Sequence, residues 1–376
     1  MTFAEAFLLN PSVKISKGSV VPFVEMSDLR PFVRDVRSDG SRPYSGGSKF
    51  LDGDVLMARI TPSLENGKTS IYRAASGNEG VPAAGSTEFI VIRGRPGVSS
   101  SNFAYYVATS QLVRDHAIGS MNGSSGRQRV QFDALANLEI ELPSMREQLE
   151  IVGVLSSIDD KIEQNQHLIA EISDLLRAYV TRGIQDGSMA VPVSKLATFV
   201  NGGAYTKGAT GTGRMVLRIA ELNSGPGAST VYNDVDVPED RVARPGDILM
   251  SWSGTLGVYR WFRDEAIINQ HIFKVLPTGY PAWLVFDRLE AAMPVFQGVA
   301  QDKATTMGHI KRSHLEETEV PIPNPHIVNE LDQLASPLWR RMVAAERECV
   351  ELSLLRDALR PELLAGRLRT QTGSAA

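Results

Sequence analysis

The chain has 376 residues, 43% of them hydrophobic, and a formal net charge of −4. That length exceeds one compact core and fits two domains with connecting elements. The single cysteine, Cys349, excludes an internal disulfide and any cysteine-based zinc cluster, and no metal site is expected.

The negative charge is concentrated in one segment. Residues 145–186 hold four basic and eight acidic side chains, whereas residues 330–369 hold seven of each. The rest of the chain is balanced, with 28 basic and 28 acidic residues. Because affinity for DNA comes largely from neutralising phosphates, this distribution still allows a basic, DNA-binding face.

The first seven residues hold no basic segment followed by an apolar one, and no run of about 18 uncharged apolar residues follows. We therefore expect neither export nor membrane insertion. The expected compartment is the cytoplasm, which also suits a free cysteine.

Residues 1–143 and 187–323 are expected to form two mixed, strand-rich domains. Runs rich in β-branched and aromatic residues, such as 89–92 and 271–275, are separated by Gly, Pro and Asn and predict strands. The predicted fold class is therefore α+β.

Residues 144–186, between these domains, are expected to form a long helix. Ser144 is followed three residues later by Glu147, a capping-box pattern that marks a helix start. Apolar residues then recur at heptad spacing, with Asn165 at the one polar position; they are Ile151, Leu155, Ile158, Ile162, Ile169, Ile172 and Leu176.

Residues 324–376 are expected to form a second long helix and a tail. Ser336 and Pro337 suit an N-cap and first turn, and the helix should end near Gly366. A looser apolar stripe consists of Leu338, Met342, Ala345, Cys349, Leu352, Leu355 and Leu359.

The chain repeats itself at long range. Residues 53–57 (GDVLM) align with 246–250 (GDILM), and residues 22–29 align with 215–222, both at an offset of 193. Two alignments at one offset are not expected by chance.

Later blocks repeat at a smaller offset. Val130 aligns with Ile310, and residues 140–143 align with 320–323, at an offset of 180. The first copy should therefore carry extra residues, which we place within residues 60–85, where Gly, Pro, Ser and Asn are dense.

Each copy thus ends in a long helix with a narrow apolar stripe. A stripe of that kind on a helix of roughly 30 residues, about 45 Å long, needs a partner of similar length. We expect the two helices to pair antiparallel as a coiled-coil spacer between the domains, which gives a pseudo-twofold repeat. The alternative is that each helix packs alone into the core of its own domain.

Short motifs occur in both halves. They are residues 53–68 (GDVLMARITPSLENGK), 124–130 (SSGRQRV), 142–148 (LPSMREQ), 199–203 (FVNGG), 246–251 (GDILMS), 269–271 (NQH), 309–313 (HIKRS) and the tail 359–366. In these motifs the chain resembles the DNA-specificity subunits of type I restriction-modification systems over essentially its whole length.

The resemblance implies two target-recognition domains, each of which reads one half of a bipartite DNA site. The helical spacers, 144–186 and 324–376, would separate the domains and carry the methyltransferase subunits. The implied partners are double-stranded DNA, those modification subunits and, in a complex that also restricts DNA, translocase subunits. No cofactor is expected.

Candidate DNA contacts are side chains that can pair with base edges or phosphates. In the first copy they are Arg59, Thr61, Asn66, Lys68, Ser124, Ser125, Arg127, Gln128 and Arg129. In the second copy they are Ser251, Ser253, Thr255, Gln270, Lys303, Thr306, His309, Lys311 and Arg312. Tyr44, Lys49 and His271 are weaker candidates. Each set could equally be polar surface turns without a ligand.

The sequence carries no enzyme signature. It lacks an Asn/Asp-Pro-Pro-aromatic methyltransferase motif and a Walker-type phosphate loop. Asp159 and Asp160 are adjacent on a predicted helix, so their carboxylates diverge. We expect a non-catalytic subunit. The alternative function is a scaffold protein that joins two ligand-binding domains through a coiled coil.

Overall fold

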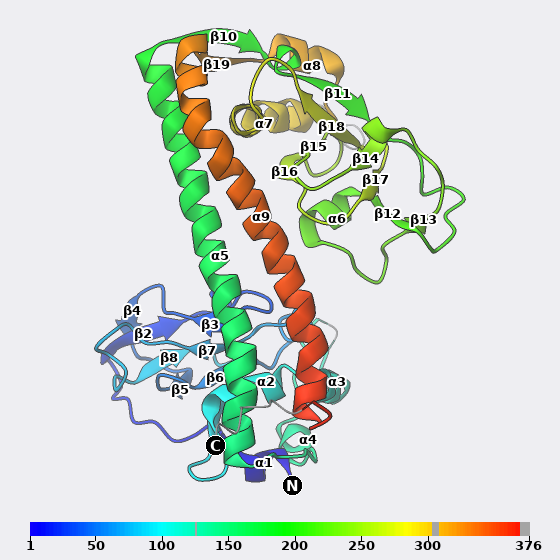
Figure 1. The fold of residues 1–376 in the computed structure, drawn as a ribbon. Helices are drawn as coiled ribbons and strands as arrows, with labels where there is room; N and C mark the ends of the chain where they lie inside the picture. Colours follow the sequence, from blue (N-terminus) through cyan, green and yellow to red (C-terminus); the bar gives the residue numbers. More distant parts are fainter. Residues whose placement is uncertain (125, 303–307, 369–376) are drawn as a thin grey trace, which may run out of the picture. The chain divides into compact units, whose positions relative to one another are not determined.

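The computed structural model describes residues 1–124, 126–302 and 308–368 (Figure 1). The chain divides into two compact units. Unit 1 comprises Met1–Asp160 with the described part of Leu352–Ala376, and unit 2 comprises the described part of Lys161–Glu351. Among the described residues, no helix combines the length and apolar character needed to cross a membrane.

Unit 1 contains two sheets and short helices. The five-stranded sheet has the order β1-β9-β6-β7-β3 and the four-stranded sheet the order β4-β2-β8-β5. The strands are β1 (Phe7–Leu9), β2 (Val20–Val24), β3 (Asp35–Val36), β4 (Ser41–Pro43), β5 (Ser48–Phe50), β6 (Val55–Ala58), β7 (Thr69–Tyr72), β8 (Ala83–Gly85) and β9 (Phe89–Gly94). The short helices are α1 (Phe3–Ala6), α2 (Ser101–Ala108), α3 (Gln111–Gly119) and α4 (Phe132–Ala136).

Unit 2 contains two four-stranded sheets, β11-β18-β15-β16 and β13-β12-β17-β14, and the pair β10-β19. Its strands are β10 (Ser188–Pro192), β11 (Ala197–Asn201), β12 (Arg214–Leu217), β13 (Tyr232–Asn233), β14 (Val242–Ala243), β15 (Ile248–Ser251), β16 (Gly257–Arg260), β17 (Ala266–Ile268), β18 (Ile272–Pro277) and β19 (Glu319–Pro323). Its helical segments are α6 (Ile219–Ser224), α7 (Ala282–Asp302), α8 (Arg312–Glu317) and the 3₁₀ turns η1 (Val193–Lys195) and η2 (Glu239–Arg241).

Apart from the edge strand β3 of unit 1, the two units share one strand topology, which confirms the predicted internal repeat. In unit 1, β9 pairs antiparallel with β1 and β6, and β6 pairs antiparallel with β7. In unit 2, β18 likewise pairs antiparallel with β11 and β15, and β15 pairs antiparallel with β16. The second sheets also correspond, because β2·β8 and β12·β17 are both parallel pairs. The expected α+β class is therefore confirmed.

The repeated Gly-Asp motif opens the central strand of each unit. Gly53 and Gly246 both have a positive φ, a conformation that favours glycine. Asp54 and Asp247 each accept a hydrogen bond from the backbone N–H three residues earlier, at 2.7 Å. The same turn therefore precedes β6 and β15.

These central strands are buried on both faces, as their unbroken apolar runs require. In β6, Val55 and Met57 face one apolar core and Leu56 faces another. In β15, Leu249 likewise points away from the core that holds the residues on either side of it. Most of the extra residues of the first copy also fall where predicted, because residues 59–68 and 73–82 join β6 to β7 and β7 to β8, whereas the shorter 252–256 and 261–265 join their counterparts.

Two long helices, α5 (Met145–Asp186) and α9 (Pro325–Leu364), each contribute to both units. The Ser144–Glu147 capping box begins α5 as predicted, with the Ser144 N–H donating to the Glu147 carboxylate at 2.9 Å. By contrast, the predicted start of the second helix at Ser336 is wrong, because α9 begins at Pro325. Ser336 lies inside α9 and donates its hydroxyl to Asp332.

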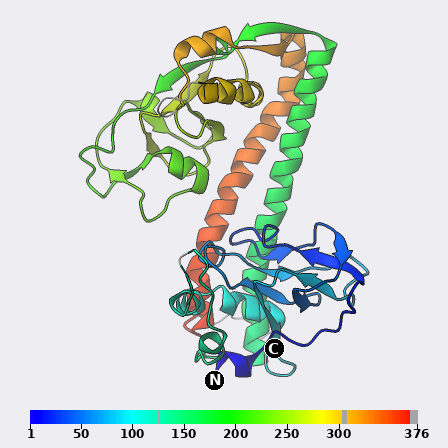
Figure 2. The same ribbon diagram turned by 180° about the vertical axis from the view of Figure 1, so that it is seen from behind.

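The helices pair antiparallel within each unit, so the alternative of two helices packed alone is wrong. In unit 2, Asn165 donates its side-chain amide to Glu348 at 2.8 Å, and Ser173 contacts the sulfur of Met342 at 3.3 Å. In unit 1, the N-terminal part of α5 and the C-terminal part of α9 both belong to the unit (Figure 2), and Leu363 joins the apolar core that contains the first turns of α5.

Most residues of the predicted apolar stripe of α5 are buried. Its buried members are Ile151, Leu155, Ile158, Ile162, Ile172 and Leu176, and Ile169 is partly buried. In α9, Met342 is buried, and Leu338 and Leu359 pack at the edges of the cores, whereas Leu352 is partly buried. Leu355 was wrongly placed in the stripe: it is 48% exposed, and the neighbouring Arg356 is buried instead.

Arg356 is buried because it forms an ion pair with Asp159. The Arg356 guanidinium donates to one Asp159 oxygen at 2.8 Å, and the Tyr106 hydroxyl donates to the other at 2.8 Å. Burial and the neighbouring Asp159 charge both raise the pKa of Tyr106. The contact ties α5 to α9 and to α2 within unit 1. Breaking a buried pair on one side leaves an uncompensated charge.

We therefore predict that Asp159→Asn lowers the free energy of unfolding of unit 1 by about 3–5 kcal/mol. The matched control is Asp357→Asn, which removes the exposed carboxylate that contacts Arg356 at 3.2 Å and should cost less than about 1 kcal/mol. Urea denaturation, monitored by far-UV circular dichroism, measures both changes. Equal, small losses would contradict the assigned role of the buried pair.

Candidate nucleic-acid interface

Three segments of unit 1 meet where β6 ends and β9 begins. The Arg59 N–H donates to the Glu88 carbonyl at 2.9 Å, and the Val130 N–H donates to the Arg59 carbonyl at 2.8 Å. Ile60 forms an antiparallel bridge with Arg129. These backbone contacts place the side chains of Arg59, Glu88 and Arg129 together, and we call these three residues cluster 1.

Glu88 connects the two arginines of cluster 1. Arg129 donates from Nε at 3.0 Å and from Nη2 at 2.7 Å, so it grips both carboxylate oxygens. Arg59 lies farther away, with its Nε 3.6 Å from the carboxylate and without a hydrogen-bond partner in the described residues. The hydrogen bonds from Arg129 lower the pKa of Glu88 despite its partial burial. The carboxylate is therefore ionised at neutral pH.

Arg59 also lines a small polar cavity of about 320 Å³ in unit 1. Lys49, from β5, lines the same cavity, and its ammonium lies 5.2 Å from the centre of the Tyr44 ring. The structure thus brings two cationic side chains to one hollow beside cluster 1. Such an arrangement suits an anionic or acceptor-rich group.

The loop that carries Arg129 is held by backbone contacts near its end and is exposed at its tip. The Thr61 N–H donates to the Gln128 carbonyl at 3.0 Å, and the Thr61 hydroxyl contacts the same oxygen at 3.4 Å. Ser124 and Arg127 are exposed and form a turn, in which the Arg127 N–H donates to the Ser124 carbonyl at 3.0 Å. Arg127 is thus a candidate phosphate contact, whereas Ser125 lies outside the described residues.

The two remaining candidates of the first copy differ in exposure. Lys68 donates from its ammonium to the Met26 carbonyl at 2.8 Å, so it holds the segment that follows β2. Asn66 is exposed in the connection between β6 and β7. Of the pair, only Asn66 presents its side chain to solvent without a structural bond among the described residues.

Unit 2 repeats the backbone frame of cluster 1. The Trp252 N–H donates to the His271 carbonyl at 3.2 Å, the Ile310 N–H donates to the Trp252 carbonyl at 3.0 Å, and Ser253 bridges to His309. Trp252, His271 and His309 thus occupy the places of Arg59, Glu88 and Arg129, and we call them cluster 2.

The side chains of cluster 2 form an aromatic group. The Trp252 ring centre lies 5.5 Å from that of His271 and 6.4 Å from that of His309. The Trp252 indole N–H donates to Asn201 at 3.0 Å. Nδ1 of His271 is buried without a hydrogen-bond partner in the described residues. Cluster 2 therefore consists of an indole and two imidazoles, and it has no guanidinium of its own.

Of the other second-copy candidates, Ser251 and Ser253 are turned away from solvent. Ser251 is fully buried and donates its hydroxyl to the Thr255 carbonyl at 2.7 Å, and Ser253 is 7% exposed. Their positions at the end of a central strand explain this burial, which favours a structural role for both. Thr255 and Gln270 are exposed.

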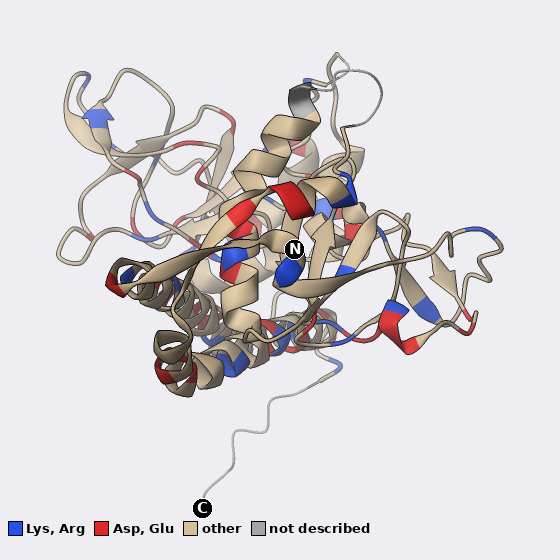
Figure 3. Cartoon of the chain, turned by 90° about the horizontal axis from the view of Figure 1, so that it is seen from above, with Lys and Arg blue, Asp and Glu red and all other residues tan. Residues whose placement is uncertain are grey.

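Basic side chains lie just after cluster 2. Lys311 and Arg312 are exposed at the start of α8, and Arg312 donates to the Phe199 carbonyl at 3.2 Å. The candidates Lys303 and Thr306 lie outside the described residues. Figure 3 shows both basic and acidic residues on the long helices.

Sequence reasoning missed Glu88 and Trp252. Trp252 could have been found by extending the first alignment by two residues, which pairs it with Arg59 at the same offset of 193. Glu88 had no such signal, because a carboxylate is not expected among groups that face phosphates. Its role follows only from the hydrogen bonds to Arg129.

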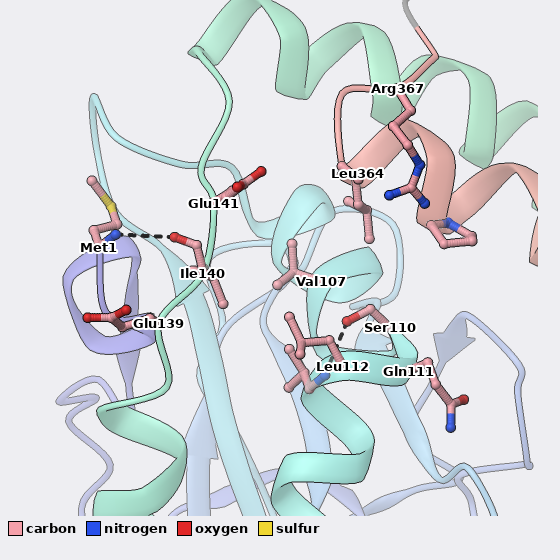
Figure 4. Close-up of a pocket in the computed structure, with 13 residues that line it drawn as sticks. Met1, Val107, Ser110, Gln111, Leu112, Glu139, Ile140, Glu141, Leu364 and Arg367 are labelled. Carbon is pink, nitrogen blue, oxygen red and sulfur yellow. Dashed lines mark hydrogen bonds between the residues drawn. The ribbon is translucent and has the colours of Figure 1, made fainter.

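A larger hollow in unit 1, of about 840 Å³, lies among α2, α3, the residues before α5 and the end of α9 (Figure 4). Val107, Leu112 and Leu364 give it a partly apolar lining, and the N-terminal amine of Met1 donates to the Ile140 carbonyl at 3.2 Å on its rim. None of the candidate DNA contacts lines it.

Comparison with known proteins addresses the family. Residues 14–174 match the model of the type I restriction modification DNA specificity domain. The specificity subunit of the type I restriction enzyme EcoEI from Escherichia coli is 30% identical over 179 residues, which cover 44% of this chain. That match spans 28% of the EcoEI subunit, so the chain aligns with less than a third of that relative.

Two further likenesses extend over nearly the whole chain. The specificity subunit of the type I restriction enzyme MjaIX from Methanocaldococcus jannaschii is 20% identical, with 96% of this chain and 90% of that subunit covered. The crystal structure of a type I restriction-modification S subunit from M. genitalium superposes with a TM-score of 0.58 at 14% identity, over 96% of this chain and 95% of the other. The latter supports the fold alone. Residues 14–174 thus resemble the type I restriction modification DNA specificity domain, and nearly the whole chain is similar to a type I specificity subunit.

Proposed function

We propose that this chain is the sequence-specific DNA-binding subunit of a type I restriction-modification complex. It reads a bipartite DNA site and positions methyltransferase subunits and, where the complex cuts DNA, restriction subunits. It contributes no catalytic group itself, it needs no cofactor, and it works in the cytoplasm. The observation that carries the proposal is one backbone frame that occurs twice with different side chains.

This repeated frame suits a reader of two unlike half-sites. Each unit gathers three side chains at the end of a buried central strand, and each has exposed basic residues close by in sequence: Arg127 in unit 1, Lys311 and Arg312 in unit 2. Rigid strands fix the direction of the side chains that they carry. Exposed arginine and lysine supply phosphate contacts, which set the orientation of the protein on the duplex. A scaffold protein has no need of this arrangement, and the family match does not favour it.

The boundaries that we propose for the working parts are residues 1–143 and 187–323 for the two target-recognition domains. Residues 144–186 and 324–376 would be the spacers. In this proposal the paired helices set the number of unread base pairs between the half-sites. Double-stranded DNA and the modification subunits are the partners.

Arg127 provides the first test. Because its side chain is exposed and has no partner among the described residues, Arg127→Ala should weaken binding to all duplexes similarly and reduce the salt slope of log K by about 1. The matched control is Arg146→Ala, which removes an 82% exposed arginine from α5 in the same unit. Fluorescence anisotropy at several salt concentrations measures both slopes, and equal slopes for the two variants would count against loop contact with DNA.

Helix length provides the second test. Removing residues 163–169 from α5 and the opposing residues 343–349 from α9 deletes one heptad from each and preserves the apolar register. Seven residues span about 10 Å, so the gap between the half-sites should shorten by about three base pairs. Selection from a library of randomised duplexes reads the gap directly. Gln164→Ala, an exposed change in the same segment, should leave the gap as it is in the unmodified chain. If the deletion leaves the gap unchanged, the paired helices do not set the spacing between the half-sites.

A further inference from the structure

Glu88 holds only one edge of the Arg129 guanidinium. The carboxylate accepts from Nε and Nη2, so the edge formed by Nη1 and Nη2 points elsewhere. On that edge the structure gives one long contact, from Nη1 to the Arg127 carbonyl at 3.4 Å. The Arg129 side chain is 41% exposed. A second ligand could therefore meet a guanidinium whose orientation is already fixed.

A guanidinium edge with only this long contact among the described residues matches guanine. Guanine presents two acceptors, N7 and O6, on its major-groove edge, and arginine pairs with both at once. That pairing needs a fixed plane and direction, which the Glu88 carboxylate supplies. A phosphate contact needs neither. Moreover, the negative charge of Glu88 offsets one of the two arginines, so cluster 1 is poorly suited to serve as a simple anchor for phosphates.

Cluster 2 has the same backbone frame but different chemistry. Trp252 donates its single N–H to Asn201, and its ring lies among those of His271, Phe273 and His309. Nε2 of His271 contacts the side-chain amide of Gln270 at 3.2 Å, and neither imidazole has the paired donors of a guanidinium. At the matching place in its own half-site, unit 2 therefore cannot read guanine as an arginine does.

We propose that Glu88 is a positioning residue that orients Arg129 to read a guanine in the half-site of unit 1, whereas unit 2 reads the equivalent base through Trp252 and its imidazoles. This inference rests on the proposed function. It deepens that function, because it assigns a base to one cluster and explains by side-chain chemistry why the two half-sites differ.

The test measures base preference for the full-length chain by selection from randomised duplexes. Wild type should select two separated blocks of bases, with guanine at one position of one block. Glu88→Gln leaves Arg129 its charge but loosens its orientation, and should lower the preference for that guanine about tenfold or more. Arg129→Lys keeps the charge but removes the paired guanidinium donors. It should lower the preference for guanine by a similar factor and leave the salt slope unchanged.

The matched control is Glu25→Gln. It removes the carboxylate of an exposed pair with Arg42 in the same unit and should leave both blocks unchanged. Glu88→Asp should restore part of the guanine preference, because it keeps the carboxylate. Trp252→Ala should alter only the block of bases that Glu88→Gln leaves unchanged. A purely structural role for Glu88 would instead lower the unfolding temperature and weaken binding to every duplex equally.

The outcomes separate the inference from the function beneath it. If wild type selects two blocks, and Glu88→Gln and Arg129→Lys both keep every base preference, the assignment of Glu88 and Arg129 is overturned. The same holds if the position that they affect prefers a base other than guanine. If wild type selects no sequence at all, the proposed function fails and the inference fails with it.

Discussion

The antiparallel pairing of α5 with α9 is the constraint on which the rest of the structure depends, because each helix contributes to both units. In unit 1 the pairing includes the buried contact of Asp159 with Arg356, and in unit 2 it includes the contact of Asn165 with Glu348. Neither polar contact can form if one helix slides by a turn, so together they specify the register. As a result, unit 1 is completed only when the last helix of the chain returns to it.

Within this constraint, the two units keep one backbone pattern and differ in side-chain chemistry. At the helix anchor, unit 1 uses Tyr106 with the carboxylate of Asp159, whereas the residues aligned at an offset of 180 in unit 2 are Phe286 and Trp339, whose ring centres lie 5.3 Å apart. The clusters at the strand ends differ in the same way, as an arginine–glutamate pair and an aromatic group. Backbone hydrogen bonds hold each position without regard to the side chain. The frame is therefore retained while the chemistry that a ligand meets can change.

This division explains what the sequence could and could not predict. Double burial of the central strands, the Gly-Asp turns and the capping box are local and periodic features, so the repeat, the fold class and the start of α5 were predictable. Arg356 broke the apolar stripe because a buried ion pair replaces an apolar contact, and Ser336 resembled an N-cap although Asp332 satisfies it within α9. Glu88 was invisible as a functional residue because its importance lies in a contact with Arg129, 41 residues away.

The proposed reading of one block of bases by the cluster of each unit can be checked by duplicating cluster 1. In the chain to be measured, residues 191–323 are replaced by a second copy of residues 1–143, joined at the matching ends of the repeat. This chain carries cluster 1 twice, and selection from randomised duplexes should return the same block of bases in both halves of the site. Two unlike blocks, as for the unmodified chain, would contradict the account.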